Sequence, residues 1–449
     1  MSPSVIYSGI RRALAPGESM YLVLQRASRA HLPWSEFLTL DLPPEMSVSE
    51  SWDLLERVQR SVGIEIPVPD FEGNEYWYVR THQITDALCR LQCRCRSDSS
   101  LHRRLSTTRG RRTVTRTRID ETIAAAQMDG LDIARDEAYA LLQLDLKPRT
   151  GTQRIVRNTL TAIGELDTLV DKPFTPELFE RLRETLLAGV EPGSWQVTEP
   201  RRGLVSQDFA DDAVRAGSDI QLRRICDYAN HQTGDEYDHP VFRALLLPDL
   251  FRVYRPLPDM NSQVGRLVYR LYALKADLPV LGMIPLSHVK LAWAEGTLDS
   301  PFVHYGPEEY FEGRAHAGTD LTDYATQAVA LALTGLATIQ SQQDRLEQRD
   351  AELRDLLQRD PELNHRQRSV LGRALRNPQA EFRIAYHKTT HSIVYATARA
   401  DLLELVERGY LEQQTRGRAF VFVPRPRLRE FIEHGRARDD AGGVEQGDR

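Results

Sequence analysis

The stretch FRVYRPLPDMNSQVGRLVYRLY, Phe251–Tyr272, joins two apolar segments of helical spacing through a short loop with two prolines. The first turn of the second helix has free backbone N–H groups and the positive end of the helix dipole, so it favours the binding of phosphate or carboxylate. Asp259 could hold a hard cation beside it. The candidate anion-binding residues are Arg255, Asn261, Ser262, Gln263, Gly265 and Arg266.

A simpler interpretation stays open for the same loop. Asp259 or Asn261 could merely cap the helix, because both residue types are common at helix starts. Spacing alone favours this capping interpretation. A decision therefore needs the sequence on either side of the loop.

Helical periodicity dominates the sequence on both sides, so we expect a mainly α protein. A segment of turn formers and alternating apolar residues, 194–214, predicts one small β-hairpin within the helical core. At the C-terminus, two helices followed by a hairpin with Gly417 at its tip are in the order of a winged helix-turn-helix, which is α+β. The expected parts are an N-terminal α/β region of unknown role (1–80), a helix and a basic arginine-rich loop (81–118), the helical core (119–340), a helical linker (341–362), the winged helix (363–434) and a disordered tail (435–449).

The loop resembles the signature of Fic (Fido) proteins, His-Pro-Phe-x-Asp-Gly-Asn-Gly-Arg-x-x-Arg. Placed on it, RPLPDMNSQVGR has Pro256, Asp259, Asn261, Gly265 and Arg266. Upstream, HPVFRALLLPDLFRVY resembles the helix that precedes the motif, and GSWQVTEP resembles the flap that positions a target protein, here within 194–214. The resemblance implies AMP transfer from ATP to a protein hydroxyl, with Mg²⁺ on Asp259. ATP and Mg²⁺ are thus the cofactors that the resemblance implies, although none is certain.

The sequence departs from this motif at the positions that perform the chemistry. Arg255 stands where the family has its catalytic histidine, and a guanidinium has no acceptor atom with which to take a proton. Met260 and Ser262 replace glycines, and Gln263 removes a fixed positive charge. Loss of a general base typically costs ~10²- to 10⁴-fold in rate, and loss of an anion donor ~10²- to 10³-fold. We therefore expect a regulatory or ligand-binding pseudoenzyme.

Two alternatives keep an active transferase open. Another base could be recruited, and His239 and His288 are the histidines that we expect near this core. Chemistry that needs no base is the second alternative, with Arg255 binding an anionic ligand.

A regulatory contact is implied by the same resemblance. The segment 119–133, which includes ETIAAAQMDGLDI, resembles the inhibitory helix of the family, with Asp129 in place of its glutamate and Ala125 in place of its serine or threonine. The resemblance implies an ion pair between Asp129 and Arg266. An ordinary salt bridge without regulation is the alternative.

The C-terminal part could bind double-stranded DNA or a protein. The candidate DNA-binding residues are Tyr395, Thr397 and Arg399 at the start of the second helix and Arg416 and Arg418 on the hairpin. Asp401, Glu404 and Glu407 make that helix acidic further along, which favours protein docking. The long helix before this part has a thin apolar stripe, so it could form a homodimer or connect two domains.

Composition adds little about partners. The 449 residues carry a net charge of -6, which gives no overall attraction to nucleic acid or anionic membranes. No segment has the roughly 18 apolar residues that a membrane span needs, so we expect a cytoplasmic protein with no membrane among its partners. Cys89, Cys93 and Cys95 lack the paired spacing of a zinc site and are predicted to be reduced thiols on a helix.

Overall fold

The computed structural model describes residues 31–32, 37–40, 46–70, 73–195, 218–232, 238–298, 319–416 and 419–434. The chain divides into two compact units, Met1–Ser341 and Gln342–Arg449. This division lies next to the predicted boundary at residue 340. The predicted flap beyond Trp195, the tip of the C-terminal hairpin and the predicted disordered tail all lie outside the described residues.

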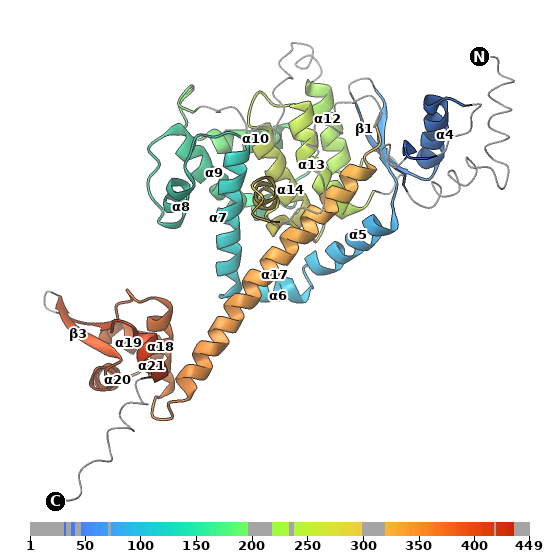
Figure 1. Cartoon of the computed structure of the whole chain (residues 1–449). Helices are drawn as coiled ribbons and strands as arrows, with labels where there is room; N and C mark the ends of the chain where they lie inside the picture. The colour runs from blue at the N-terminus through green and yellow to red at the C-terminus, as the bar shows by residue number, and fades with distance from the viewer. Residues whose placement is uncertain are drawn as a thin grey trace, which may run out of the picture. The chain divides into compact units, whose positions relative to one another are not determined.

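The first unit is mainly helical, as predicted (Figure 1). A two-stranded antiparallel sheet pairs Ile64 with Tyr78, and the second strand also pairs through Trp77 with Asp320. The described elements are α4 (Val48–Ser61), β1 (Ile64–Pro69), β2 (Glu75–Tyr78), α5 (His82–Cys95), α6 (Ser100–Ser106), α7 (Gly110–Met128), α8 (Arg135–Gln143), α9 (Gly151–Glu165), η1 (Leu166–Leu169), α10 (Pro176–Leu187), α12 (Ser218–Ala229), α13 (Pro240–Tyr254), α14 (Asn261–Lys275), η2 (Leu281–Met283), α15 (Leu286–Ala294) and the first half of α17 (Thr322–Gln358).

The basic segment that was predicted to be a loop is helical instead. Ser99 caps α6 by accepting a hydrogen bond from the backbone N–H of His102, and Leu101 and Leu105, four residues apart, give α6 a buried face. The helix predicted at 119–133 begins nine residues earlier, at Gly110, where it buries Thr113 and Thr117, and it ends at Met128. Charge composition misled the prediction because these buried positions, rather than the arginines between them, decide the local structure.

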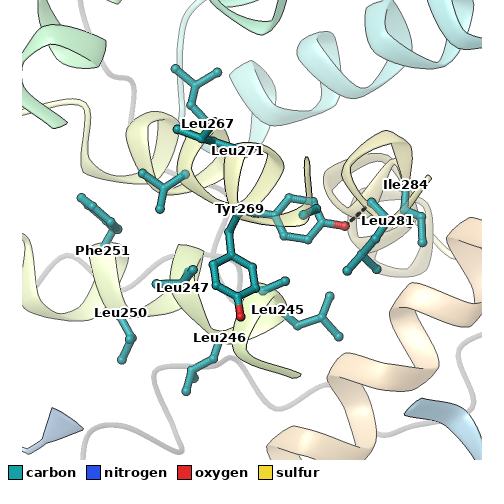
Figure 2. Close-up of a cluster of buried hydrophobic side chains, with 14 of the residues drawn as sticks. Leu245, Leu246, Leu247, Leu250, Phe251, Leu267, Tyr269, Leu271, Leu281 and Ile284 are labelled. Atoms are coloured by element: carbon teal, nitrogen blue, oxygen red, sulfur yellow. Dashed lines mark hydrogen bonds between the residues drawn. The ribbon is translucent and has the colours of Figure 1, made fainter. Parts of the chain in front are cut away.

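The centre of this unit is the packing of α13 against α14 (Figure 2). Both helices are buried along almost their whole length, and the hydroxyl of Tyr269 donates a hydrogen bond to the carbonyl of Leu281 at 2.5 Å. Gly265 allows the close approach. A Cβ atom there would lie 2.9 Å from the Cβ of Phe251 and 3.0 Å from the Cα of Pro248. This contact fixes the two ends of the motif loop.

The second unit contains the end of α17 and a small helical and β part. The predicted helices and hairpin are present, and α19 and α21 are additional helices that the sequence analysis missed. The backbone of Phe382 pairs with Phe422 on the outer side of the hairpin. The elements are α18 (His365–Arg376), α19 (Ile384–His391), α20 (Tyr395–Glu407), β3 (Leu411–Arg416), β4 (Ala419–Pro424) and α21 (Leu428–His434).

Among the described residues, none of the helices combines the length and the apolar character needed to cross a bilayer.

Replacing Gly265 with alanine should destabilise the first unit by about 1–3 kcal/mol, because the added methyl group must separate α13 from α14. Gly164 in α9 is the matched control, since a Cβ there meets nothing within 4 Å. Gly164→Ala should leave stability unchanged or raise it by up to about 1 kcal/mol. Calorimetric unfolding of both variants measures the difference. Equal effects at the two sites would contradict the packing role of Gly265.

Candidate functional site

The motif loop between α13 and α14 has a left-handed residue at each end. Arg255 has φ of 46° and ends α13, and Met260 has φ of 55° and precedes α14. A left-handed conformation costs a non-glycine residue roughly 1–2 kcal/mol. Burial of the Met260 side chain, which is 5% exposed, offsets this cost by roughly 1.5–3 kcal/mol. A buried methionine therefore stabilises the loop where the family motif has a glycine.

Asn261 braces the same loop. Its side-chain oxygen accepts a hydrogen bond from the backbone N–H of Leu257 at 2.9 Å, and its side-chain nitrogen donates to the Leu257 carbonyl at 2.8 Å. The capping interpretation is not what the structure has, because the residue before α14 is Met260 and no side chain caps that helix. Asn261 holds the loop closed instead.

Asp259, the candidate metal ligand, is held by an arginine that the sequence analysis did not single out. Arg183 of α10 donates from Nε to Oδ1 of Asp259 at 2.6 Å and from Nη2 to Oδ2 at 3.2 Å. Its third nitrogen, Nη1, donates to Glu180 at 2.5 Å. Both carboxylate oxygens of Asp259 therefore already face a positive charge. The hydrogen bond to Asp259 raises the pKa of Arg183 above its ordinary value.

The predicted contact between Asp129 and Arg266 is present. Nη2 of Arg266 donates to the Asp129 carboxylate and, at 3.3 Å, to the carbonyl of Ala125. Asp129 follows the last residue of α7, and the left-handed Gly130 ends the helix there. Burial raises the pKa of Asp129, although the neighbouring Arg266 acts in the opposite direction. The pair joins the C-terminal end of α7 to the first turns of α14.

A second buried charge network lies at Asp249 of α13, and one member, Arg252, acts electrostatically on Asp129. Asp249 of α13 forms an ion pair with Arg252 at 3.2 Å and lies 4.0 Å from the amine of Lys290 on α15. The hydroxyl of Tyr324 donates to its other oxygen at 2.6 Å. Burial opposes the ionisation of Asp249, but Lys290 and Arg252 outweigh it and lower its pKa. These residues fix α13 against α15 and α17.

Glu121 and Arg270 form a further link that sequence reasoning missed. Glu121, on the inner face of α7, accepts a hydrogen bond from the backbone N–H of His288 at 3.0 Å and lies 3.7 Å from Arg270. Nη1 of Arg270 donates to the carbonyl of Gly282. The available signal was a glutamate within the apolar and alanine-rich part of α7, where a charged residue requires a partner.

The space between α7, α9 and α14 is small. A cavity of ≈ 20 Å³ remains there, which is about the room for one water molecule. Glu121, Asp129, Arg266 and Arg270 contribute its charged lining, and Gln263 its amide. A space of this size is too small for a nucleotide.

Gly265 has a packing role in this structure, and its place among the anion-binding residues stays a prediction. It lies inside α14, where its small size serves the contact with Pro248 described above. Ser262, Gln263 and Arg255 make no side-chain hydrogen bond or ion pair within the described part of the chain, and Arg255 is exposed. The candidate residues therefore fall into three groups. Asn261 hydrogen-bonds within the loop, and Arg266 forms an ion pair with α7. The side chains of Arg255, Ser262 and Gln263 have no such partner among the described residues.

The two candidate histidines lie at the start of α13 and in the first turn of α15. His239 begins α13, where its Nδ1 accepts from the backbone N–H of Val241 at 3.2 Å and its Nε2 contacts Gln92 at 3.1 Å. Arg255 follows the last residue of the same helix, about 24 Å away along its axis. Burial lowers the pKa of His239 to about 4. His288 lies in the first turn of α15, next to α7.

The cysteines carry no metal site within the ranges that the structure describes. Cys89, Cys93 and Cys95 lie on α5, as expected, and all three are free thiols. Cys95 is buried, and burial raises its pKa to about 12. No three His, Cys, Asp or Glu side chains gather for a metal ion in those ranges.

In the second unit, the start of α20 is exposed. Tyr395 and Arg399 face solvent and Thr397 is half-buried, whereas the side chains of Arg416 and Arg418 lie outside the described residues. The acidic character expected further along α20 is weaker than predicted, because Asp401 is buried. It accepts two hydrogen bonds from Arg366, at 2.7 and 2.9 Å.

Asp401 is part of the interior of this unit and not of its surface. Asn364 also donates to it, and His387 lies 3.1 Å from it. Burial opposes its ionisation, but the hydrogen bonds from Arg366, Asn364 and His387 outweigh burial and lower its pKa to about 2.

Comparison with known proteins gives a likeness of structure only. No family model matches the sequence, and no curated protein matches it. Among solved structures, the chain is similar to a Fic family protein from Desulfovibrio desulfuricans G20, with 14% identity over 77% of this chain and 96% of that chain and a TM-score of 0.43. It is also similar to Fic-1 from C. elegans, with 14% identity over 76% of this chain and 98% of that chain and a TM-score of 0.38. These matches name the family that the motif resembles. At such TM-scores they assign no residue a role.

Proposed function

We propose that this chain is a degenerate Fic-type protein, a regulatory pseudoenzyme whose former nucleotide site is closed. The observation that carries the proposal is the chemistry at the end of α13. Arg255 offers no proton acceptor there. His239 lies at the opposite end of α13, and its ring nitrogens contact Val241 and Gln92.

Two contacts support the closed state. The ion pair between Asp129 and Arg266 joins α7 to α14 over a cavity of ≈ 20 Å³. The salt bridge between Arg183 and Asp259 takes up the carboxylate that the resemblance assigns to Mg²⁺. Transfer of AMP to a protein hydroxyl remains the alternative, and it would need another base and a rearranged pocket.

Incubation of the purified chain with labelled ATP and Mg²⁺ should give no label on protein above background. Arg255→His/Gln263→Arg is the comparison, because it returns a proton acceptor and a cation to the motif, and its labelling should exceed that of the natural chain. Label transfer by the natural chain that disappears on Asp259→Ala would contradict the pseudoenzyme proposal.

The second unit favours a second role, binding of double-stranded DNA through the start of α20. The element order, with α19 and α20 followed by the β3–β4 hairpin, is that of a winged helix-turn-helix. Tyr395 is 54% exposed, and Arg399 is on the same exposed first turns. Because Asp401 is buried against Arg366, it adds no surface charge that would repel phosphates. Protein docking through the same surface is the alternative.

Fluorescence anisotropy with a labelled duplex tests DNA binding in the full chain. The affinity should fall steeply as salt increases, since phosphate contacts release counterions. Arg399→Gln should weaken binding at low salt, whereas Arg427→Gln, an exposed arginine between β4 and α21, should change it little. No binding at low salt, or equal effects of the two substitutions, would favour the docking alternative.

A further inference from the structure

We infer that the guanidinium of Arg183 takes the place of a divalent cation at Asp259, so that this protein holds its motif loop without a metal ion. The inference rests on the proposed function, because the resemblance is what implies Mg²⁺ at this carboxylate. The residues present do not fit Mg²⁺, because both oxygens of Asp259 face the guanidinium of Arg183, where Mg²⁺ would need room for its octahedral shell of waters.

The geometry around Arg183 is that of a cation with two carboxylate partners. Asp259 uses both oxygens, at 2.6 and 3.2 Å, and Glu180 approaches a third nitrogen at 2.5 Å. One partner comes from α10 and the other from the loop before α14. A planar guanidinium matches a carboxylate through two parallel hydrogen bonds, which an ammonium group cannot do.

The arginine is also held firmly in place. It lies on α10, which is anchored in the core by the buried Phe179, Leu182 and Leu186, and only 19% of its side chain is exposed. Arginine remains protonated at every physiological pH, so it does not release the carboxylate by losing a proton. A divalent ion at Asp259 would meet a fixed positive charge at hydrogen-bonding distance.

Replacement of Arg183 should turn the same place into a cation site. Without the guanidinium, Asp259 and Glu180 would remain on either side of the vacated position, and two carboxylates facing one position attract a hard cation. Arg183→Gln removes the charge. Arg183→Lys keeps the positive charge but loses the paired hydrogen bonds to Asp259. Comparison of the two variants therefore shows whether the charge of Arg183 excludes the metal ion or whether Arg183 only stabilises the loop.

The test is a titration of the full chain with Mn²⁺, in which electron paramagnetic resonance measures the free ion. Binding is assigned to this site where Asp259→Asn abolishes it. The natural chain and Arg183→Lys should show no binding that depends on Asp259, and Arg183→Gln should bind Mn²⁺ at this site more tightly than they do by about tenfold or more. Arg181→Gln, on the exposed side of the same helix, should behave as the natural chain.

Three results would overturn the inference. The natural chain could show Mn²⁺ binding that folded Asp259→Asn abolishes. Folded Arg183→Gln, checked by circular dichroism, could show no gain over the natural chain. Arg183→Lys could gain as much as Arg183→Gln, which would mean that the hydrogen-bond geometry and not the charge excludes the ion. None of these results requires AMP transfer, so failure of this inference is distinct from failure of the proposed function.

Discussion

The ion pair between Asp129 and Arg266 is the interaction on which the closed site depends. It connects the end of α7 to the first turns of α14, and both partners are shielded from water. Removal of one partner from a buried pair typically costs about 3–5 kcal/mol, because the other charge is left unpaired. The pair therefore holds α7 over the motif helix, and the small cavity beneath it follows from that position.

Two guanidinium groups lie at positions of the motif loop where the resemblance implies other chemistry. Arg255 stands where the resemblance places a proton acceptor, and Arg183 faces the carboxylate that the resemblance assigns to a metal ion. Met260 has a left-handed conformation, which suits glycine, and its side chain is buried. Each of these residues is compatible with a well-packed loop, and together they support the proposed pseudoenzyme.

Local signals in the sequence predicted the features that depend on neighbouring residues. The start of α14, the long α17 and the C-terminal hairpin follow from periodicity and turn residues, and the contact of Asp129 with Arg266 was implied by the family motif. Arg183 lies 76 positions from Asp259, and Glu121 lies far from Arg270, so no local pattern indicates either pair. The arginine-rich α6 was missed for a related reason, since its two buried leucines were outweighed by charge composition.

Calorimetric titration of the natural full chain with ATP, with and without Mg²⁺, tests the closed, metal-free site most directly. We predict no ATP binding at sub-millimolar concentrations, because the cavity beside the ion pair has room for about one water molecule. We predict no effect of Mg²⁺, because Arg183 already binds Asp259. Stoichiometric micromolar binding of ATP that Mg²⁺ strengthens and Asp259→Asn weakens would contradict this account.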